Sequence, residues 1–513
     1  MKNNTRTQNT INNSLTGILL QIITSVFALI YRTILIRVLG VEYLGINGLF
    51  SNILNLLSLS ELGFNIAIAY RMYEPASKND YSKLGALLNF FEHIYKCVAS
   101  IVFIIGLCLI PFLKFLIKDN GEIPNDINMY AVYIVMLIQS ATSYLFTSRQ
   151  ILLQAYQKEY YNNIFQIIST IVKYAAQIFI LIVFKDYFLL LLIGIIIGII
   201  LNIYYYYAIS KKFKLIFANK DKINKDEKAQ IYKEVKALLM HKIGGVVLSS
   251  TDNLVISSIL GLTVVGIYSN YTVVVSMIAT IICKLLGGVT ASVGNLKISN
   301  EREKLHDTFL GLNMLTMWVV SFCSVCLYCL INPFIELWLG EEYVLQSIEV
   351  LSIVAAFYIM YSRYMNTTFV NACGIYYMDK YRPIIEAFIN LVISIICAKY
   401  IGLTGVFIGT VVSELVTAWW REPYLLYKHI FFSYKNVSKY SYMSIFFIAS
   451  TFLLEIVCNN ICLLLKNNWY SLFVKAFICL MIINIYYYVI LRSKKEFYII
   501  GNLLIKIKEI SRR

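Results

Sequence analysis

The chain has 513 residues, of which 59% are hydrophobic and 14% charged, and its formal net charge is +16. Its apolar runs exceed the roughly 18 to 20 residues that cross a bilayer, so the composition excludes a soluble fold and predicts an all-α polytopic membrane protein. The basic charge predicts contact with anionic inner-leaflet lipids rather than with nucleic acid, because most of it falls on one side of the predicted spans.

We predict about fourteen transmembrane helices. In chain order they cover residues 14–38, 44–70, 84–113, 128–147, 160–183, 187–208, 237–259, 265–290, 308–332, 345–370, 383–398, 400–420, 440–460 and 468–491. With the N-terminus in the cytoplasm, the cytoplasmic segments hold 32 Lys and Arg, whereas the outer segments hold five. Because cytoplasmic loops are enriched in these residues, we expect both termini on the cytoplasmic side of the plasma membrane.

Two motifs recur along the chain. Residues 39–46 (LGVEYLGI) return 221 residues later as 260–267 (LGLTVVGI), and residues 194–198 (GIIIG) are echoed 211 residues later by 405–409 (GVFIG). The repetition predicts two lobes of six helices. Since six is even, both lobes enter the membrane from the same side, and their pseudo-symmetry is parallel. Such duplicated bundles are typical of secondary transporters.

The repeats also predict the order of domains. It runs from a cytoplasmic N-terminus (1–13) through an N-lobe (14–208), a basic cytoplasmic linker (209–236), a C-lobe (237–420) and an accessory helix pair (440–491) to a basic amphipathic C-terminal tail (492–513). The tail places Phe497 and Ile500 among basic residues at helical spacing. We therefore expect it to lie on the inner leaflet.

Ionisable side chains inside the spans are functional candidates, because burying them in lipid is costly. Gln21, Ser25 and Arg32 share one face of the first helix, and the repeat carries Arg32 to the neighbour of Asp252. Arg and Lys stabilise phosphate oxyanions. The predicted substrate-binding residues are Gln21, Ser25, Arg32, Arg149, Lys284 and Arg363, and the predicted ion-coupling residues are Glu61 and Asp252. Structural ion pairing of Arg32 with Asp252, snorkelling of Arg149 and a packing role of Glu61 remain alternatives.

Catalytic residues, cofactors and metal sites are not predicted. The sequence has no phosphate-binding loop of the Gly-x-x-x-x-Gly-Lys-Ser/Thr type and no long outer segment that could hold a catalytic domain. Cys323, Cys326 and Cys329 follow one another at three-residue spacing, but they lie in an apolar helix without acidic or histidine neighbours. We interpret them as packing residues, and Cys458 and Cys462 as free thiols.

Several segments carry a family resemblance. Residues 32–46 (RTILIRVLGVEYLGI) and 57–64 (LSLSELGF) resemble the first two helices of bacterial polysaccharide repeat-unit flippases of the multidrug/oligosaccharidyl-lipid/polysaccharide exporter superfamily. Residues 251–253 with 259–261 resemble the seventh helix, and 154–160 the turn after the fourth. The resemblance implies a V-shaped pair of lobes, alternating access, and an undecaprenyl-diphosphate-linked oligosaccharide as cargo for capsule, exopolysaccharide or O-antigen assembly. Without a nucleotide site, we expect transport to draw on an H⁺ or Na⁺ gradient, on the membrane potential or on downstream consumption of the cargo. A polysaccharide polymerase and glycosyltransferases are further expected partners.

Other functions stay open from the residues alone. They are a teichoic-acid or peptidoglycan-precursor flippase, a cation-coupled multidrug exporter, a membrane glycosyltransferase or polymerase, and an envelope-assembly scaffold. An exporter of organic cations needs carboxylates or aromatic faces in its cavity. The intramembrane arginines stay charged when buried, whereas carboxylates can protonate. We therefore predict a net positive central cavity, which favours a lipid-diphosphate cargo.

Overall fold

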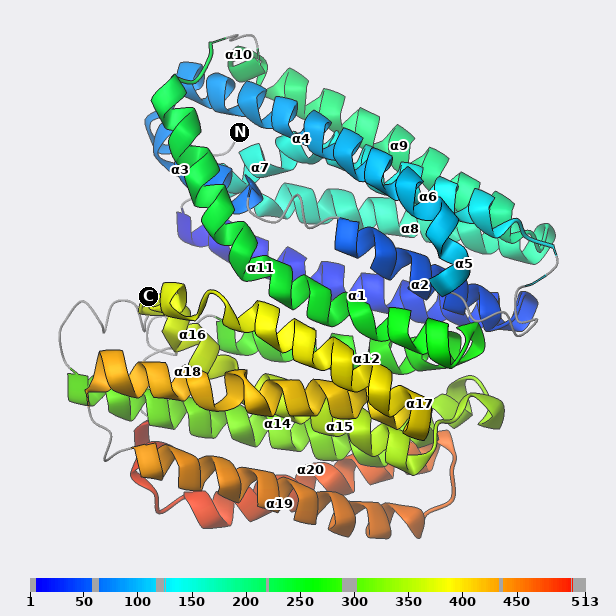
Figure 1. The fold of residues 1–513 in the computed structure, drawn as a ribbon, viewed down its shortest axis with the longest axis vertical. Coiled ribbons are helices and arrows are strands. Elements are labelled where there is room, and N and C mark those ends of the chain that lie inside the picture. Colours follow the sequence, from blue (N-terminus) through cyan, green and yellow to red (C-terminus); the bar gives the residue numbers. More distant parts are fainter. Residues whose placement is uncertain are drawn as a thin grey trace. The chain divides into compact units, whose positions relative to one another are not determined.

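The computed structural model describes residues 6–57, 64–116, 124, 126–217, 221–287, 302–432, 437–499 and 501. The regular elements in these ranges are all helices (Figure 1). The first are α1 (Arg6–Val38), α2 (Glu42–Leu57), α3 (Phe64–Lys78), α4 (Tyr81–Leu109), α5 (Leu113–Leu116), α6 (Met129–Tyr144), α7 (Thr147–Ala155), α8 (Glu159–Val183), α9 (Tyr187–Lys212), α10 (Lys214–Phe217) and α11 (Lys225–Ile259). They are followed by α12 (Leu262–Gly287), α14 (Arg302–Trp338), α15 (Ser347–Ser362), α16 (Tyr364–Ala372), α17 (Arg382–Val416), α18 (Ala418–Leu426), the π-helical turn Tyr427–Phe431, α19 (Val437–Leu463) and α20 (Trp469–Leu491), with short 3₁₀ turns at Ile110–Phe112, Glu341–Tyr343 and Tyr376–Asp379.

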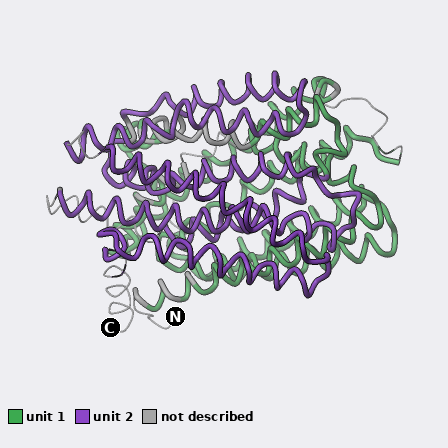
Figure 2. The backbone as a smooth tube through the Cα atoms, turned by 90° about the horizontal axis from the view of Figure 1, so that it is seen from below, with its two compact units in different colours: residues 1–266 green, residues 267–513 purple. Residues whose placement is uncertain are grey.

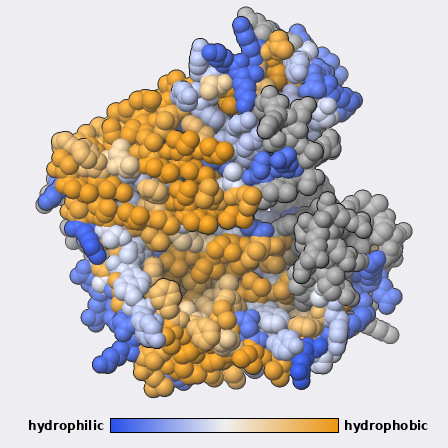
Figure 3. Space-filling view, turned by 180° about the vertical axis from the view of Figure 1, so that it is seen from behind, coloured by the Kyte–Doolittle hydropathy of each residue, from blue (hydrophilic) through white to orange (hydrophobic). Residues whose placement is uncertain are grey.

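The helices are those of a multi-pass membrane protein, as predicted. Within the described ranges, eleven helical segments are long and apolar enough to cross a membrane. One of them, residues 382–431, holds two helices that meet at Ile401 and Gly402, where Gly402 adopts a φ of 62° that favours glycine. The count is consistent with the fourteen predicted spans, because α2 with α3, and α11, add further segments. Figure 3 shows wide apolar surfaces, as lipid contact requires.

Contacts divide the chain into two compact units, residues 1–266 and 267–513 (Figure 2). The first unit extends beyond the predicted N-lobe because α11 packs against α2 and α3. Helix α11 also begins within the predicted linker, at Lys225. Asp226 and Glu227 occupy its first turn, where the positive end of the helix dipole stabilises their negative charge.

In the first unit, residues predicted to lie on the same side of the membrane contact one another at the same end of the helices. At one end the Asn13 side-chain amide donates a hydrogen bond to the backbone oxygen of Gln157 at 3.0 Å. Both residues lie in or beside predicted cytoplasmic segments. At the other end the Tyr43 hydroxyl donates to Asp126 at 2.6 Å, and the Tyr187 hydroxyl donates to the backbone oxygen of Tyr43 at 3.4 Å. Tyr43 and Asp126 belong to predicted outer turns, and Tyr187 is the first residue of a predicted span.

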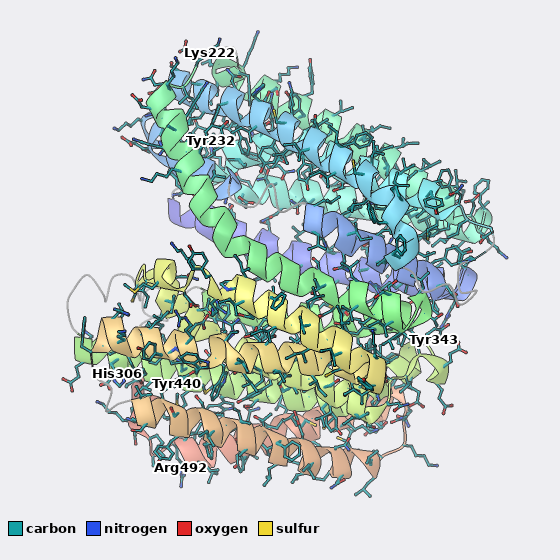
Figure 4. All side chains as sticks on the ribbon, in the orientation of Figure 1. Lys222, Tyr232, His306, Tyr343, Tyr440 and Arg492 are labelled. Carbon is teal, nitrogen blue, oxygen red and sulfur yellow. The ribbon has the colours of Figure 1, made fainter. Side chains whose placement is uncertain are left out.

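In the second unit too, residues predicted to lie on opposite sides of the membrane are at opposite ends of the helices. Figure 4 places His306 and Arg492 at one end of the bundle and Tyr343 at the other. At the Tyr343 end the Asn467 side chain donates to the Glu336 carboxylate at 2.6 Å. The cytoplasmic location of the termini stays a prediction that rests on the charge distribution. The amphipathic tail lies mostly outside the described residues.

The repeated motif of residues 39–46 and 260–267 packs against itself. A Cβ added at Gly45 would lie 2.2 Å from the backbone oxygen of Leu262, and one added at Gly266 would lie 2.4 Å from the backbone oxygen of Val41. The two contacts are reciprocal, because the 221-residue repeat carries Val41 to Leu262 and Gly45 to Gly266. Small residues let membrane helices approach backbone to backbone. The motif is therefore a symmetric packing contact that only glycine can make.

The second repeated motif differs between its copies. In α17 a Cβ at Gly405 would lie 2.3 Å from the backbone carbon of Cys397, and one at Gly409 would clash with Ser394. In α9 a Cβ at Gly194 would meet only side chains, whereas Gly198 has no neighbouring atom within 4 Å. The glycines of this motif thus make close backbone contacts in α17, whereas the glycines of its copy in α9 do not.

Gly45→Ala should destabilise the protein. The added methyl group would overlap a backbone oxygen, and overpacking of this kind costs about 1–3 kcal/mol. Gly198→Ala is the matched control, because it adds a methyl group where there is space and should leave stability equal or slightly higher. Thermal unfolding of both variants in detergent checks this. Equal midpoints would contradict the packing role of Gly45.

Candidate functional site

Arg32 lies on α1, next to aromatic side chains of α1 and α8. It is partly buried and close enough to the phenols of Tyr31 and Tyr174 to interact with both electrostatically. The rings of Tyr31 and Tyr174 have centroids 5.3 Å apart, and α8, which carries Tyr174, packs along α1. Charges attract more strongly where water is scarce. The arrangement therefore places a cation where it can attract an anionic ligand.

A polar stripe continues from Arg32 along α1. The Gln21 side-chain amide donates to the Ser25 hydroxyl at 3.5 Å, and both side chains are partly buried. Steps of four and seven residues place Gln21, Ser25 and Arg32 on one helix face. The predicted grouping on α1 thus has the geometry to present hydrogen-bond donors alongside one cation.

Asp252 and Asn253 lie on α11 with buried oxygen atoms. The Oδ1 atom of each has no hydrogen-bond partner among the described residues. A Cβ added at Gly48 of α2 would lie 3.9 Å from the Asn253 side-chain nitrogen. Buried polar atoms usually have partners, and an unsatisfied carboxylate oxygen can be satisfied by a proton or a cation. Asp252 therefore keeps its predicted role as a candidate for ion coupling.

Arg149 is enclosed within the first unit. It is 4% exposed, forms an ion pair with Glu92 of α4 and donates from Nε to the Ser210 hydroxyl at 3.1 Å. Its guanidinium carbon lies 3.7 Å from the ring centre of Tyr206 and 4.0 Å from that of Phe217. A carboxylate thus neutralises the guanidinium and two rings cover it. This favours a structural role over the predicted contact with substrate.

Arg363 is held by carboxylates in the second unit. Its Nε donates to Glu414 at 2.7 Å, one terminal nitrogen donates to Glu422 at 2.7 Å, and the other lies 3.9 Å from Glu386. The residue stands at the break between α15 and α16, with φ −90° and ψ 4°. The arginine therefore joins this break to α17 and α18.

The ion pairs extend into a larger network. Arg382 donates to Glu386 at 2.5 Å and to Asp379 at 2.6 Å, and it lies 3.4 Å from Glu422. Arg421 donates to Asp379 at 2.6 Å. Within the described residues the network joins three arginines to four carboxylates. Sequence reasoning missed it because it placed 371–382 and 421–439 in loops. The available signal was the spacing of three and four residues between Asp379, Arg382 and Glu386.

Lys284 and Glu61 are the remaining predicted site residues. Lys284 is exposed near the end of α12. Glu61 lies outside the described residues. Sequence reasoning also missed Glu92, which lies on the predicted third span and only gained meaning when the fold placed it beside Arg149.

A cavity of about 600 Å³ lies where α14, α19 and α20 meet near their predicted cytoplasmic ends. Its walls are mainly apolar, with Met314, Tyr442 and Phe446 among them. Lys439, Lys494 and Glu496 also line it, and Lys439 forms an ion pair with Glu496. Apolar walls of this kind suit an acyl chain.

Residues 11–291, more than half of the chain, match the family described as polysaccharide biosynthesis protein. The chain belongs to this family. The match includes the polar stripe of α1 and the buried pair on α11. No curated protein matches this polysaccharide biosynthesis protein in sequence.

Solved structures identify its fold. The lipid II flippase MurJ in an inward closed conformation has a TM-score of 0.65 at 15% identity, over 94% of this chain and 99% of that chain. An inward-facing MATE multidrug transporter of the MOP superfamily has 0.59 at 13% identity, over 77% and 92%. A mutant of the Vibrio cholerae MATE transporter VcmN has 0.55 at 14% identity, over 83% and 99%. This member of the polysaccharide biosynthesis family thus has the fold of these transporters.

Arg363→Met should lower the stability of the protein. It would leave Glu414 buried without its cation and Glu422 with Arg382 alone, and removing one partner of a buried ion pair costs about 3–5 kcal/mol. Lys399→Met, at an exposed position of α17, is the control and should unfold like the wild type in detergent. Replacing both carboxylates by glutamine in the Arg363→Met background should recover part of the loss. An unchanged midpoint for Arg363→Met would refute the structural role.

Proposed function

We propose that the protein flips undecaprenyl-diphosphate-linked oligosaccharide repeat units from the inner to the outer leaflet of the plasma membrane by alternating access. The observation that carries the proposal is the match to a polysaccharide biosynthesis family in a chain with a transporter fold. A transporter contributes to such a pathway by moving a precursor, since it supplies no covalent chemistry. Capsule, exopolysaccharide or O-antigen assembly would use the product, with polymerase and glycosyltransferases as partners.

Arg32 is the residue we assign to the diphosphate of the cargo. Its neighbours Tyr31 and Tyr174 are phenols, which interact electrostatically with the guanidinium. Arg149 is engaged by a carboxylate and two rings, and Arg363 by three carboxylates. Arg presents several donors in a fixed plane that matches phosphate oxygens. Gln21 and Ser25 would add hydrogen bonds to sugar or phosphate oxygens on the same helix face.

A peptidoglycan-precursor flippase is the second candidate. It is favoured by the likeness to a structure named a lipid II flippase, which extends over 94% of this chain. At 15% identity that likeness supports the fold and does not choose the cargo. Transport assays that offer both classes of lipid-linked glycan to the same proteoliposomes separate the two candidates.

Asp252 is the residue that we assign to ion coupling. Its buried Oδ1 atom, which has no partner among the described residues, is positioned to take up a proton or Na⁺. Cargo movement could also draw on the membrane potential, which is worth about 2.3 kcal/mol per charge per 100 mV. Glu61, the other coupling residue expected from the sequence, stays a prediction.

Arg32→Ala should abolish glycan export, and Arg32→Lys should retain part of it, because a lysine keeps the charge and loses the planar donor array. Arg37→Ala is the matched control, since Arg37 lies on the same helix and is exposed. Export is measured as surface glycan in cells that depend on the variant, at equal protein levels. Normal export by Arg32→Ala would remove Arg32 from the proposal.

Asp252→Asn should make transport insensitive to ion gradients, because the amide can no longer exchange a proton or hold a cation. The measurement is flipping of a lipid-diphosphate oligosaccharide in proteoliposomes, with the pH and Na⁺ gradients collapsed in turn. Asp126→Asn, at an outer turn, is the control and should keep the wild-type dependence. If collapsing both gradients left wild-type flipping unchanged, ion coupling through Asp252 would be wrong.

A further inference from the structure

Three helices of the second unit bring buried cysteines together. Cys329 of α14, Cys462 of α19 and Cys479 of α20 are all buried, and their sulfur atoms lie within 4.8 Å of one another. The Sγ atoms of Cys462 and Cys479 are 3.9 Å apart. We call these three residues the thiol cluster.

The spacing of the thiol cluster fits metal coordination. Zinc–thiolate bonds are about 2.3 Å long, so two sulfurs of a tetrahedral site lie about 3.8 Å apart. The separation of 3.9 Å between Cys462 and Cys479 is close to that edge. Cys329 completes a triangle of ligands.

A polar cavity leads to the cluster. It has a volume of about 350 Å³, and Cys329 and Cys462 form part of its lining. Glu336 and Asn467, which lie at the predicted outer ends of the helices, line it as well. A metal site needs a route by which the ion arrives, and this cavity provides one from the outer side.

A buried lysine can balance the negative charge of three thiolates that bind one Zn²⁺. Lys475 is 3% exposed, lies one turn before Cys479 on α20 and interacts electrostatically with Cys462. Its ammonium group donates to the Asn467 side chain at 2.6 Å. Three thiolates, one Zn²⁺ and the Lys475 ammonium have no net charge together. A neutral assembly avoids the cost of burying charge in an apolar region.

We propose that the thiol cluster binds one thiophilic d¹⁰ cation, Zn²⁺ or Cu⁺, through Cys329, Cys462 and Cys479. Soft thiolate ligands select these ions, and each coordinating thiol releases its proton to water when the metal binds. The charge balance favours Zn²⁺, since Cu⁺ would leave one negative charge. The ion joins the accessory helices α19 and α20 to α14 near their predicted outer ends. This site is independent of the proposed transport function.

Metal binding by purified full-length protein tests the proposal. The protein is reduced, washed with chelator in detergent, and supplied with Zn²⁺ or, without oxygen, with Cu⁺, and the metal retained after desalting is counted. We expect one equivalent per chain in the wild type and at least about a tenfold loss in Cys462→Ser and Cys479→Ser. Cys373→Ser is the matched control, because Cys373 is buried in the same unit outside the cluster.

A second variant guards against misfolding of the serine variants. Lys475→Met keeps every thiol and should weaken Zn²⁺ binding by about 10- to 100-fold in competition with a coloured chelator, as loss of an outer-shell partner does. Retention of Cu⁺ alone, with the same dependence on Cys479, would support the site and assign it to copper. Three results would overturn it: neither metal retained by the wild type, equal retention by Cys479→Ser, or a Cys462–Cys479 disulfide in the protein as isolated.

Discussion

The reciprocal contact of Gly45 with Leu262 and of Gly266 with Val41 is the constraint on which the first unit depends. It brings two backbones to a distance at which no side chain fits, and it does so twice through one repeated motif. The close approach places α2 beside α11, so that Gly48 faces Asn253. The buried oxygens of Asp252 and Asn253 are consequences of this approach, because a bulkier residue would separate the helices and admit solvent.

Most buried charges serve to hold broken helices together. The fourth predicted span is interrupted between α6 and α7, and the tenth is interrupted at Arg363. Each break has a buried arginine in or near it, and each arginine is neutralised by carboxylates from neighbouring helices. A charge neutralised in this way is poor at binding a ligand, because the ligand would have to replace an existing ion pair.

The accessory helices carry chemistry at both ends. At their predicted cytoplasmic ends they form, with α14, an apolar cavity that Lys439 and Lys494 also line. Toward the opposite ends they contribute Cys462 and Cys479 to the thiol cluster. Both features combine the accessory helices with α14, which belongs to the predicted C-lobe.

The sequence by itself determined the class of fold, the membrane spans and the repeat, because hydrophobic length, charge bias and internal similarity are properties of continuous segments. Arg32 and Asp252 were proposed from helical spacing and repeat positions, which are also local, and their roles stay predictions. It did not show that Glu92 neutralises Arg149, or that Glu414 and Glu422 neutralise Arg363, because ion pairing depends on side chains far apart in the chain. The cysteines make the same point. Cys329 and Cys479 are 150 residues apart, and only the packing of three helices brings their sulfurs together.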